Sequence, residues 1–355
     1  MSITSKPFGK NLQGEQVMLY TMTNASGASV SLTDLGATLV SIIVPDKNGD
    51  MADVALGFDC AEKYAVGHGS MGDTIGRYGN RIGKGHFVLD GVAYQLELND
   101  NGKNSLHGGS DNFSTKMWTV TPIETAHRDS LAFHYVSADG ESNFPGTLDV
   151  TVTYTWDEDS NLIICYEATT DKTTLCNMTN HTYFNLAGHD HGTVRDHVVY
   201  IDSDVITPVD DELIPLGGYM PVSQTPFDMR EGLLLSDGLD AMETCSQMMI
   251  PKGYDHNYVL RKGEAMGLAA CVHHEETGRT MEVITDQPAM QLYSACTTYY
   301  EGGKDGAVYG NYSGLCLETQ HCPDDPNNPQ FPGTTVLRPG EKYDTTTIYA
   351  FRIDD

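Results

Sequence analysis

Glu318 stands where an apolar segment, 314–317, meets a loop rich in proline and aspartate. A strand over 314–317 would hold this carboxylate at the edge of a packed interior, partly away from water. Partial burial disfavours the charged form of a carboxyl group, which raises its pKa and makes it an effective base near neutral pH. We therefore predict that Glu318 is a general base, provided that the fold brings an acid close to it.

Four other segments concentrate polar side chains beside glycine or aromatic residues. Strand patterning and turn chemistry do not explain them, and binding residues usually lie in such loops and strand ends. Each residue also has a structural interpretation: a core histidine that is hydrogen-bonded, an arginine in a surface ion pair, or an aspartate that accepts backbone N–H bonds in a turn. The candidates are Asn80 and Arg81 in 76–82, His107 in 106–109, His181, Thr182 and Tyr183 in 179–186, and Asp255 in 254–257.

The elements that must position these residues are predicted to be strands. Apolar and polar residues alternate from Leu148 to Trp156, which indicates a half-buried antiparallel strand. The runs 87–89 and 92–96 flank Asp90-Gly91, a pair typical of a tight hairpin turn. Further strands are predicted at 39–44, 162–168, 268–273, 280–284, 289–294 and 348–352.

Helical signals are few, and the best is a turn or two following Asp59 as an N-cap. Many strands with short turns must each bury one face against a second sheet. The fold class is therefore predicted to be all-β: a large antiparallel β-sandwich with few short helices. Neither a linker, a repeat nor a shift in composition marks a boundary, so residues 1–355 are expected to form a single domain.

The net charge of −28 disfavours nucleic acid as a partner, because such a surface repels phosphodiester backbones. An uncharged small molecule fits this charge better than a sugar phosphate does. No apolar run approaches the roughly 20 residues that span a bilayer, and the first residues lack the apolar stretch of a secretory signal. The eight cysteines include no CxxC pair and are expected to be reduced, so we expect a cytoplasmic protein.

The polar segments also form a series in a fixed order: GRYxNRI, LHGG, TNHTYFNL, DxxxxQLY and LETQxxPDxxNxPxFP. This series resembles that of the aldose 1-epimerases, the galactose mutarotases, and the resemblance extends over about residues 8–352. One departure is Gly79, where alanine is common in the family. It removes no functional group.

The resemblance implies one large antiparallel β-sandwich with an open cleft that binds a neutral hexopyranose and interconverts its α and β anomers. In the family, the histidine that matches His181 is the proton donor and the glutamate that matches Glu318 is the proton acceptor. No metal or other cofactor is implied. The residues that match sugar-binding or orienting positions are Asn80, Arg81, His107, Thr182, Tyr183, Asp255 and Gln291.

These residue types suit the chemistry of mutarotation. The reaction opens a cyclic hemiacetal, turns the aldehyde about the C1–C2 bond and closes the ring on the other face. Opening needs a base at the C1 hydroxyl and an acid at the ring oxygen, which a glutamate and a histidine can supply. The sugar hydroxyls need donors and acceptors, because each leaves water when it binds.

Several alternatives remain open at the level of sequence. A zinc enzyme is one, with His107, His181 and His321 as ligands, although neither HExxH nor paired cysteines are present. A glycosidase that uses Glu318 and Asp255 is another. A non-catalytic carbohydrate-binding module and an epimerase of phosphorylated sugars are the remaining two. The preferred aldose, and whether the protein is a monomer or a homodimer, are not determined by the sequence.

Overall fold

The structure, a computed structural model, describes residues 2–67, 69–125 and 128–354. It is mostly β, with 45% strand and 10% helix, and its sheets are antiparallel, as the sequence predicted. Among the described residues, no helix has the length and apolar character needed to cross a membrane.

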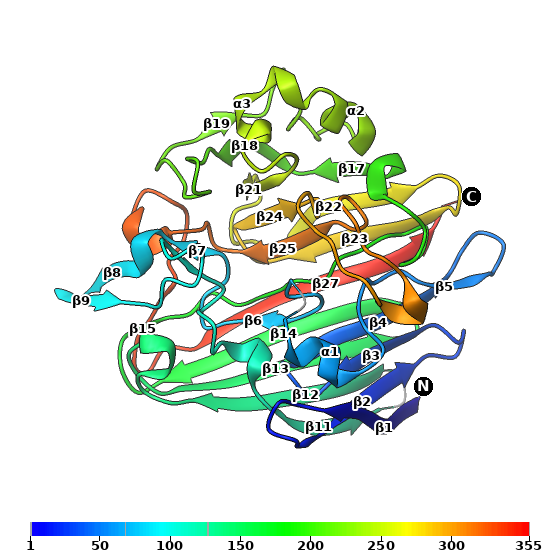
Figure 1. Cartoon of the computed structure of the whole chain (residues 1–355), viewed down its shortest axis with the longest axis horizontal. Coiled ribbons are helices and arrows are strands. Elements are labelled where there is room, and N and C mark those ends of the chain that lie inside the picture. The colour runs from blue at the N-terminus through cyan, green and yellow to red at the C-terminus, as the bar shows by residue number, and fades with distance from the viewer. Residues whose placement is uncertain (1, 68, 126–127, 355) are drawn as a thin grey trace.

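A nine-stranded sheet extends across the whole molecule (Figure 1). It buries alternate residues of its strands against the layer above, as in β13, where Leu148, Val150 and Val152 are fully buried. In spatial order its strands are β11 (Thr119–Glu124), β12 (Arg128–Ser137), β13 (Leu148–Asp157), β14 (Asn161–Thr170), β27 (Tyr343–Ile353), β23 (Arg279–Thr285), β22 (Gly267–His274), β17 (Val198–Ile201) and β20 (Leu233–Leu234).

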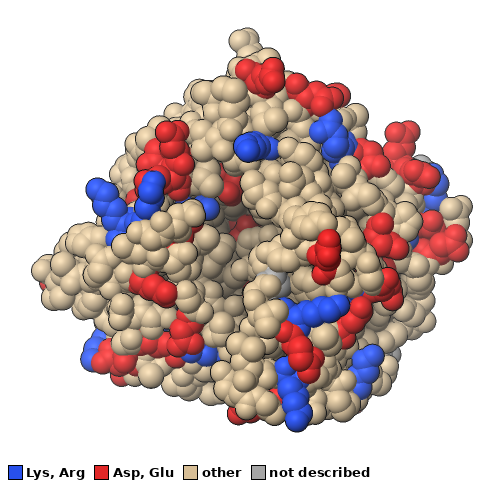
Figure 2. All heavy atoms as spheres, viewed as in Figure 1, with Lys and Arg blue, Asp and Glu red and all other residues tan. Residues whose placement is uncertain are grey.

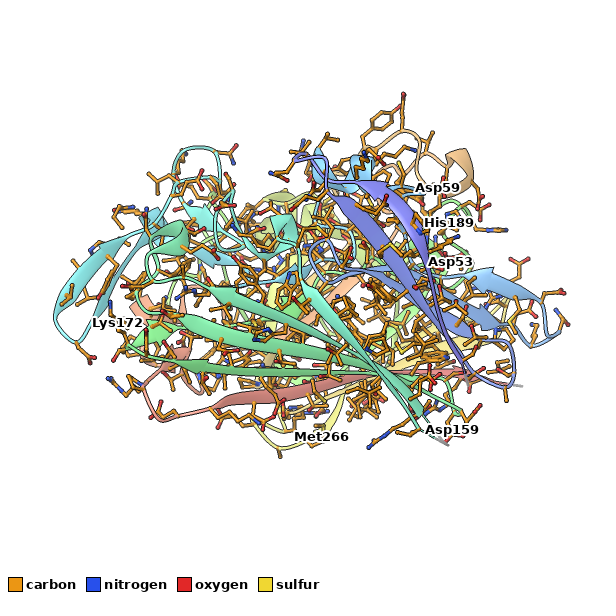
Figure 3. The ribbon with its side chains drawn as sticks, turned by 90° about the horizontal axis from the view of Figure 1, so that it is seen from below. Asp53, Asp59, Asp159, Lys172, His189 and Met266 are labelled. Carbon is orange, nitrogen blue, oxygen red and sulfur yellow. The ribbon has the colours of Figure 1, made fainter. Side chains whose placement is uncertain are left out.

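Two five-stranded sheets complete the sandwich. The first consists of β1 (Ser2–Lys10), β2 (Gln16–Thr23), β3 (Ser29–Thr33), β4 (Thr38–Pro45) and β5 (Met51–Asp53). The second, in spatial order, consists of β19 (Met220–Pro221), β18 (Ser203–Thr207), β21 (Asp255–Leu260), β24 (Ala289–Tyr293) and β25 (Cys316–Gln320). One hydrophobic core joins all three sheets, with Val30, Val152 and Leu292 as members. Figure 3 shows the side chains that fill the space between the layers.

Short ribbons and helices lie between the sheets and the surface. The ribbons pair β6 (Thr74–Ile75) with β16 (Thr179–Asn180), β7 (Arg81–Ile82) with β10 (Ser105–Leu106), β8 (His86–Leu89) with β9 (Val92–Gln95), and β15 (Thr174–Leu175) with β26 (Val336–Leu337). The helices are α1 (Ala61–Ala65), α2 (Leu235–Asp240) and α3 (Ser246–Met249). Two of these ribbons carry candidate site residues. Arg81 belongs to β7, and His107 and His181 directly follow β10 and β16.

The predicted hairpin is confirmed. Strands β8 and β9 pair, and the turn residues Asp90 and Gly91 have φ angles of 49° and 81°. Positive φ at both central positions is the geometry that an Asp-Gly turn favours.

Two local predictions were wrong. Glu318 does not end a strand over 314–317: β25 begins at Cys316 and continues to Gln320, because each of its five residues pairs with β24. The N-cap of α1 is Cys60, not Asp59. The Asp59 carboxylate, labelled in Figure 3, instead accepts the backbone N–H of Asp305 at 3.1 Å.

Candidate active site

A hollow lies near the middle of the face shown in Figure 2, with acidic atoms visible inside it. It corresponds to a cavity of about 360 Å³. A cavity of this size is within the range of small-molecule sites. Of the residues that the sequence singled out, the cavity is lined by Asn80, Arg81, His107, His181, Tyr183, Asp255 and Glu318.

Strands β21, β24 and β25 form one wall of the cavity. Gln291 of β24 lies opposite Glu318 of β25 in the register, and its Nε2 donates to Asp255 Oδ1 at 2.7 Å. Because side chains on one face of a sheet repeat every second residue, this register fixes the two carboxylates on the same wall. Glu318 is 1% exposed, and its Oε2 has no hydrogen-bond partner among the described residues.

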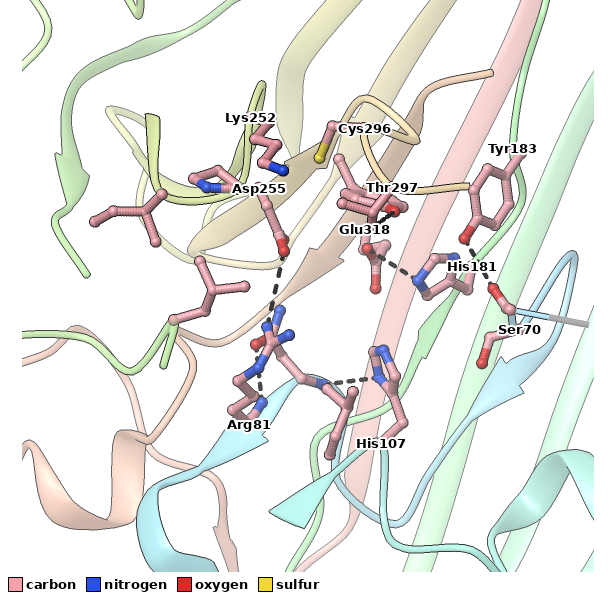
Figure 4. A pocket seen from close by; sticks show the side chains of 17 residues that line it. Ser70, Arg81, His107, His181, Tyr183, Lys252, Asp255, Cys296, Thr297 and Glu318 are labelled. Carbon is pink, nitrogen blue, oxygen red and sulfur yellow. Dashed lines mark hydrogen bonds and ion pairs between the residues drawn. The ribbon is translucent and has the colours of Figure 1, made fainter. Parts of the chain in front are cut away.

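Arg81, at the start of β7, faces the Asp255 end of the cavity (Figure 4). Its Nε lies 2.8 Å from Asp100 Oδ2, and its Nη1 lies 3.9 Å from Asp255 Oδ2. Asp100 therefore fixes the guanidinium, and the ion pair between the guanidinium and Asp255 is the longer of the two. This end of the cavity offers both a cation and a carboxylate to a polar ligand.

His181 follows β16 and faces Glu318 (Figure 4). Its Nε2 lies 3.6 Å from Glu318 Oε1. Its ring is stacked on that of Tyr183, with 5.1 Å between centroids, and the Tyr183 hydroxyl donates to the carbonyl of Gly69 at 2.8 Å. Tyr183 thus fixes the orientation of the His181 ring, with Nε2 toward the Glu318 carboxylate.

His107 and Asn80 hold each other across the β7–β10 ribbon. The backbone N–H of Asn80 donates to His107 Nδ1 at 3.1 Å, and the backbone N–H of His107 donates to the backbone carbonyl of Asn80 at 3.0 Å. An Nδ1 that accepts a hydrogen bond leaves the proton of a neutral imidazole on Nε2. The ring of His107 stands edge-on to that of His181, with 5.2 Å between centroids. Its Nε2–H is available as a donor in the cavity.

The electrostatics of the cavity follow from burial. Desolvation raises the pKa of Glu318 well above its usual value; the charge of Asp255 adds to this rise and Arg81 opposes it. The sequence led us to expect that burial would raise this pKa, and burial is the largest effect here. Desolvation also lowers the pKa of His107 far below that of a free histidine, with His181 and Arg81 contributing, so His107 is neutral near pH 7.

Comparison with known proteins identifies the family of this chain. The sequence model of the aldose 1-epimerase family matches residues 18–350. The chain belongs to the aldose 1-epimerase family. It is 39% identical over 356 residues to the galactose mutarotase of Sus scrofa, with 99% of each chain covered. It is 36% identical over 340 residues to the aldose 1-epimerase of Escherichia coli (strain K12), with 95% of this chain and 96% of that protein covered. The resemblance is confirmed, and the chain is an isomerase of the aldose 1-epimerase type.

Solved structures of aldose 1-epimerase relatives have the same fold. The galactose 1-epimerase of Lactobacillus acidophilus NCFM matches with a TM-score of 0.87 at 26% identity, and 100% of each chain is covered. An aldose epimerase homologue from C. elegans matches with a TM-score of 0.85 at 30% identity, covering 94% of this chain and 98% of that one. The predicted fold class is confirmed.

Two of the predicted sugar-binding residues lie behind the cavity wall of this epimerase. Thr182 is 1% exposed, and its hydroxyl donates to Asn180 Oδ1 at 2.5 Å. Gln291 is 3% exposed and contacts Asp255. In the structure Thr182 contacts Asn180, and Gln291 contacts Asp255.

The sequence reasoning did not select several residues of the cavity. Tyr293 belongs to β24, and a count of every second residue from Gln291 identifies it. The sequence pattern did not indicate Asp100, whose carboxylate fixes Arg81. The other lining residues that were missed are Gly69, Ser70, Leu106, Leu213, Ile250, Pro251, Lys252, Cys296 and Thr297.

Within the described residues, two groups have ligand atoms close enough to hold a metal ion. His107, His181 and Glu318 form one, and Asp196, His197 and His274 form the other. In the second group His197 Nε2 accepts the N–H of Leu186 at 2.9 Å, so its Nδ1 carries the proton and donates to Asp196. That donation makes Nδ1 unavailable as a ligand. His321, a ligand in the zinc alternative, lies apart from both groups, with its Nε2 3.9 Å from Glu264.

Proposed function

We propose that this epimerase interconverts the α and β anomers of free neutral hexopyranoses such as D-galactose and D-glucose. Glu318 is the general base at the C1 hydroxyl, and His181 is the general acid at the ring oxygen. The observation that carries the proposal is the 3.6 Å between His181 Nε2 and Glu318 Oε1 on the wall of one small cavity. Two oxygens are bonded to C1, the hydroxyl oxygen and the ring oxygen. Such a pair can reach both, with Glu318 at the hydroxyl and His181 at the ring oxygen.

The proposed reaction moves two protons and needs no co-reactant. Glu318 takes the proton of the C1 hydroxyl as the bond from C1 to the ring oxygen breaks, and His181 protonates that oxygen. The open aldehyde turns about C1–C2. On closure the two groups exchange roles: His181 takes back the proton of the attacking hydroxyl, and Glu318 returns its proton to O1. Each positioned proton transfer contributes on the order of 100-fold to 10,000-fold in rate.

The other residues of the cavity serve the remaining hydroxyls. Asp255 accepts from two neighbouring hydroxyls, with Gln291 holding its Oδ1 in place. Arg81 and Asn80 provide further polar contacts, and His107 donates from Nε2. Tyr183 and Thr182 orient the loop that carries His181. These contacts replace the water that each hydroxyl loses.

A neutral substrate fits this cavity better than a phosphorylated one. Arg81 and Lys252 are the cationic side chains among its lining residues, and Asp100 and Asp255 already neutralise Arg81. A phosphate group would also meet Asp255 and Glu318. We further propose that residues 1–355 are one domain and that the protein works in the cytoplasm; its eight cysteines are free thiols, which suits a reducing compartment.

The direct test is polarimetry of freshly dissolved α-D-galactose and α-D-glucose. The protein is expected to speed the approach of each to anomeric equilibrium, and the two rates rank the sugars. An aryl galactoside serves as the contrasting substrate, because its C1 oxygen has no proton to give. Release of the phenol from that glycoside would favour a glycosidase, and a lack of effect on both free sugars would overturn the proposal.

The activity of the wild-type enzyme is expected to fall as the pH drops through the raised pKa of Glu318, since protonation removes the base. Asp255→Asn should move this acid limb to lower pH, because the charge of Asp255 helps to raise the pKa of Glu318. It should also raise KM by about 10-fold to 100-fold through a lost charged hydrogen bond. Profiles of kcat/KM against pH measure both effects. A profile that is flat from about pH 4 to about pH 10 would contradict the assignment of the base.

Treatment with a strong chelator, followed by removal of the chelator and its metal, is expected to leave the rate of mutarotation unchanged. The proposed proton transfers use only the side chains of Glu318 and His181. Because His107, His181 and Glu318 could also hold a metal ion, the experiment is informative. Loss of activity that added zinc restores would replace the acid/base account with a metal-dependent one.

A further inference from the structure

Strand β25 brings two side chains to His181, not one. Cys316 and Glu318 are two residues apart on this strand, so both point to the same face. Glu318 Oε1 lies 3.6 Å from His181 Nε2, and Cys316 Sγ lies 3.5 Å from His181 Nδ1. The two side chains therefore hold the two ring nitrogens from one strand.

Cys316 is fully buried, with 0% exposure. Burial raises the pKa of its thiol well above the usual value, and the nearby carboxylates of Glu318 and Asp255 raise it further. The sulfur therefore keeps its proton throughout the range in which enzymes work. A thiol is a weak donor and a weak acceptor, so it can bind an imidazole nitrogen in either protonation state.

Among the described residues, other rings approach His181 from three directions. His107 stands edge-on to the ring from the β7–β10 side, Tyr183 is stacked on it, and Tyr293 of β24 approaches at 6.2 Å between centroids. His107 and the two tyrosines carry no charge near neutral pH, because their pKa values are shifted toward the neutral form by burial. Glu318 is the acidic group that meets Nε2, and Cys316 meets Nδ1.

We propose that Cys316 is a positioning residue for His181: its sulfur accepts from Nδ1–H and keeps the proton of the neutral ring on Nδ1, so that Nε2, which faces Glu318, is the nitrogen that gives and takes a proton. This inference rests on the acid/base role proposed for His181. The imidazolium gives its Nε2 proton to the ring oxygen, which leaves a neutral ring with its proton on Nδ1. The bare Nε2 can then take the proton back on closure, which the opposite tautomer could not do. When His181 is doubly protonated, the same sulfur accepts from Nδ1–H.

The chemistry of a thiol suits a group that must both give and take a proton in each turnover. A carboxylate at Nδ1 accepts only, and so favours the imidazolium form. A thiol binds both forms weakly and pulls the equilibrium toward neither. Cys316 therefore fixes which nitrogen works without fixing the charge of the ring.

Nuclear magnetic resonance of the ¹⁵N-labelled protein tests this tautomer without relying on turnover. Long-range ¹H–¹⁵N spectra separate protonated from unprotonated ring nitrogens, and the His181 signals are those that His181→Asn removes. Wild type is expected to show a protonated Nδ1 and an unprotonated Nε2 above the ring pKa, and Cys316→Ala is expected to show a mixture. A proton on Nε2 of the neutral ring in wild type, an unchanged tautomer in Cys316→Ala, or a ring that stays doubly protonated to about pH 9 would each overturn the proposal.

Kinetics supply the second readout. Cys316→Ala should lower kcat by about tenfold, the equivalent of one lost hydrogen bond, with little change in KM, and Cys316→Ser should restore part of the loss. Cys176→Ala is the matched control, since it removes another buried thiol, which lies near Arg77, whereas Cys316 contacts His181. Equal losses in the two alanine variants would indicate a packing effect and count against the proposal. If wild type had no mutarotase activity, the proposed function would fail on its own, and the tautomer would still be measured.

Discussion

Glu318→Gln is expected to lower the kcat of mutarotation by about 100-fold to 10,000-fold. Glutamine keeps the shape of the side chain but cannot take the proton of the C1 hydroxyl. Because Glu318 is 1% exposed, the uncharged amide also removes a carboxylate whose burial is costly, so the variant should fold at least as well as wild type. Polarimetry at saturating α-D-galactose measures the rate, and thermal unfolding checks the fold.

The control for this variant is Glu124→Gln, which makes the same substitution at an exposed position on the edge strand β11. It should leave kcat within about twofold of wild type, as surface substitutions usually do. A Glu318→Gln enzyme that retains more than about a tenth of the wild-type kcat would show that another group is the base.

His181→Asn is expected to cause a loss of similar size, about 100-fold to 10,000-fold in kcat. Asparagine can still donate a hydrogen bond to the ring oxygen, but it cannot transfer a proton to it. The KM for galactose should change less than kcat, because the sugar hydroxyls retain Asp255 and Arg81. Initial rates over a range of sugar concentrations separate the two parameters.

His134→Asn provides the matched control. His134 is 46% exposed on β12, where it pairs with Asp149 at 2.8 Å. A surface pair of this kind contributes little to stability, so both kcat and the fold should be preserved. A rise in KM alone for His181→Asn, with kcat unchanged, would show that His181 binds the sugar but does not transfer a proton.

The sequence was most informative where the backbone is periodic or where polar residues form recognisable segments. Alternation over 148–156 predicted β13, and the Asp-Gly pair predicted the β8–β9 turn. The segments around His181 and Glu318 identified residues that lie 3.6 Å apart although 137 positions separate them in the chain (318 minus 181). Neither residue indicates its partner by itself, and the resemblance of the whole series supplied that connection.

The remaining features depended on tertiary packing. The end of β25 is set by pairing with β24, which the apolar pattern of 314–317 does not reveal. The upward shift of the Glu318 pKa depends on how deeply the fold buries it and on the closeness of Asp255. Ser70, Lys252 and Thr297 line the cavity from loops, whose paths no periodic pattern specifies. Cys316 was recoverable, since it is two residues from Glu318 on the same strand.

The central claim is that His181 and Glu318 act as one unit, and the double variant His181→Asn/Glu318→Gln tests it most directly. If each proton transfer requires the other, the first substitution already removes almost all of the catalysis. The account predicts that the double variant mutarotates α-D-galactose within about threefold of the slower single variant. Losses that multiply, so that the double variant is slower by the product of the two single effects, would contradict a concerted pair and show that the two groups work independently.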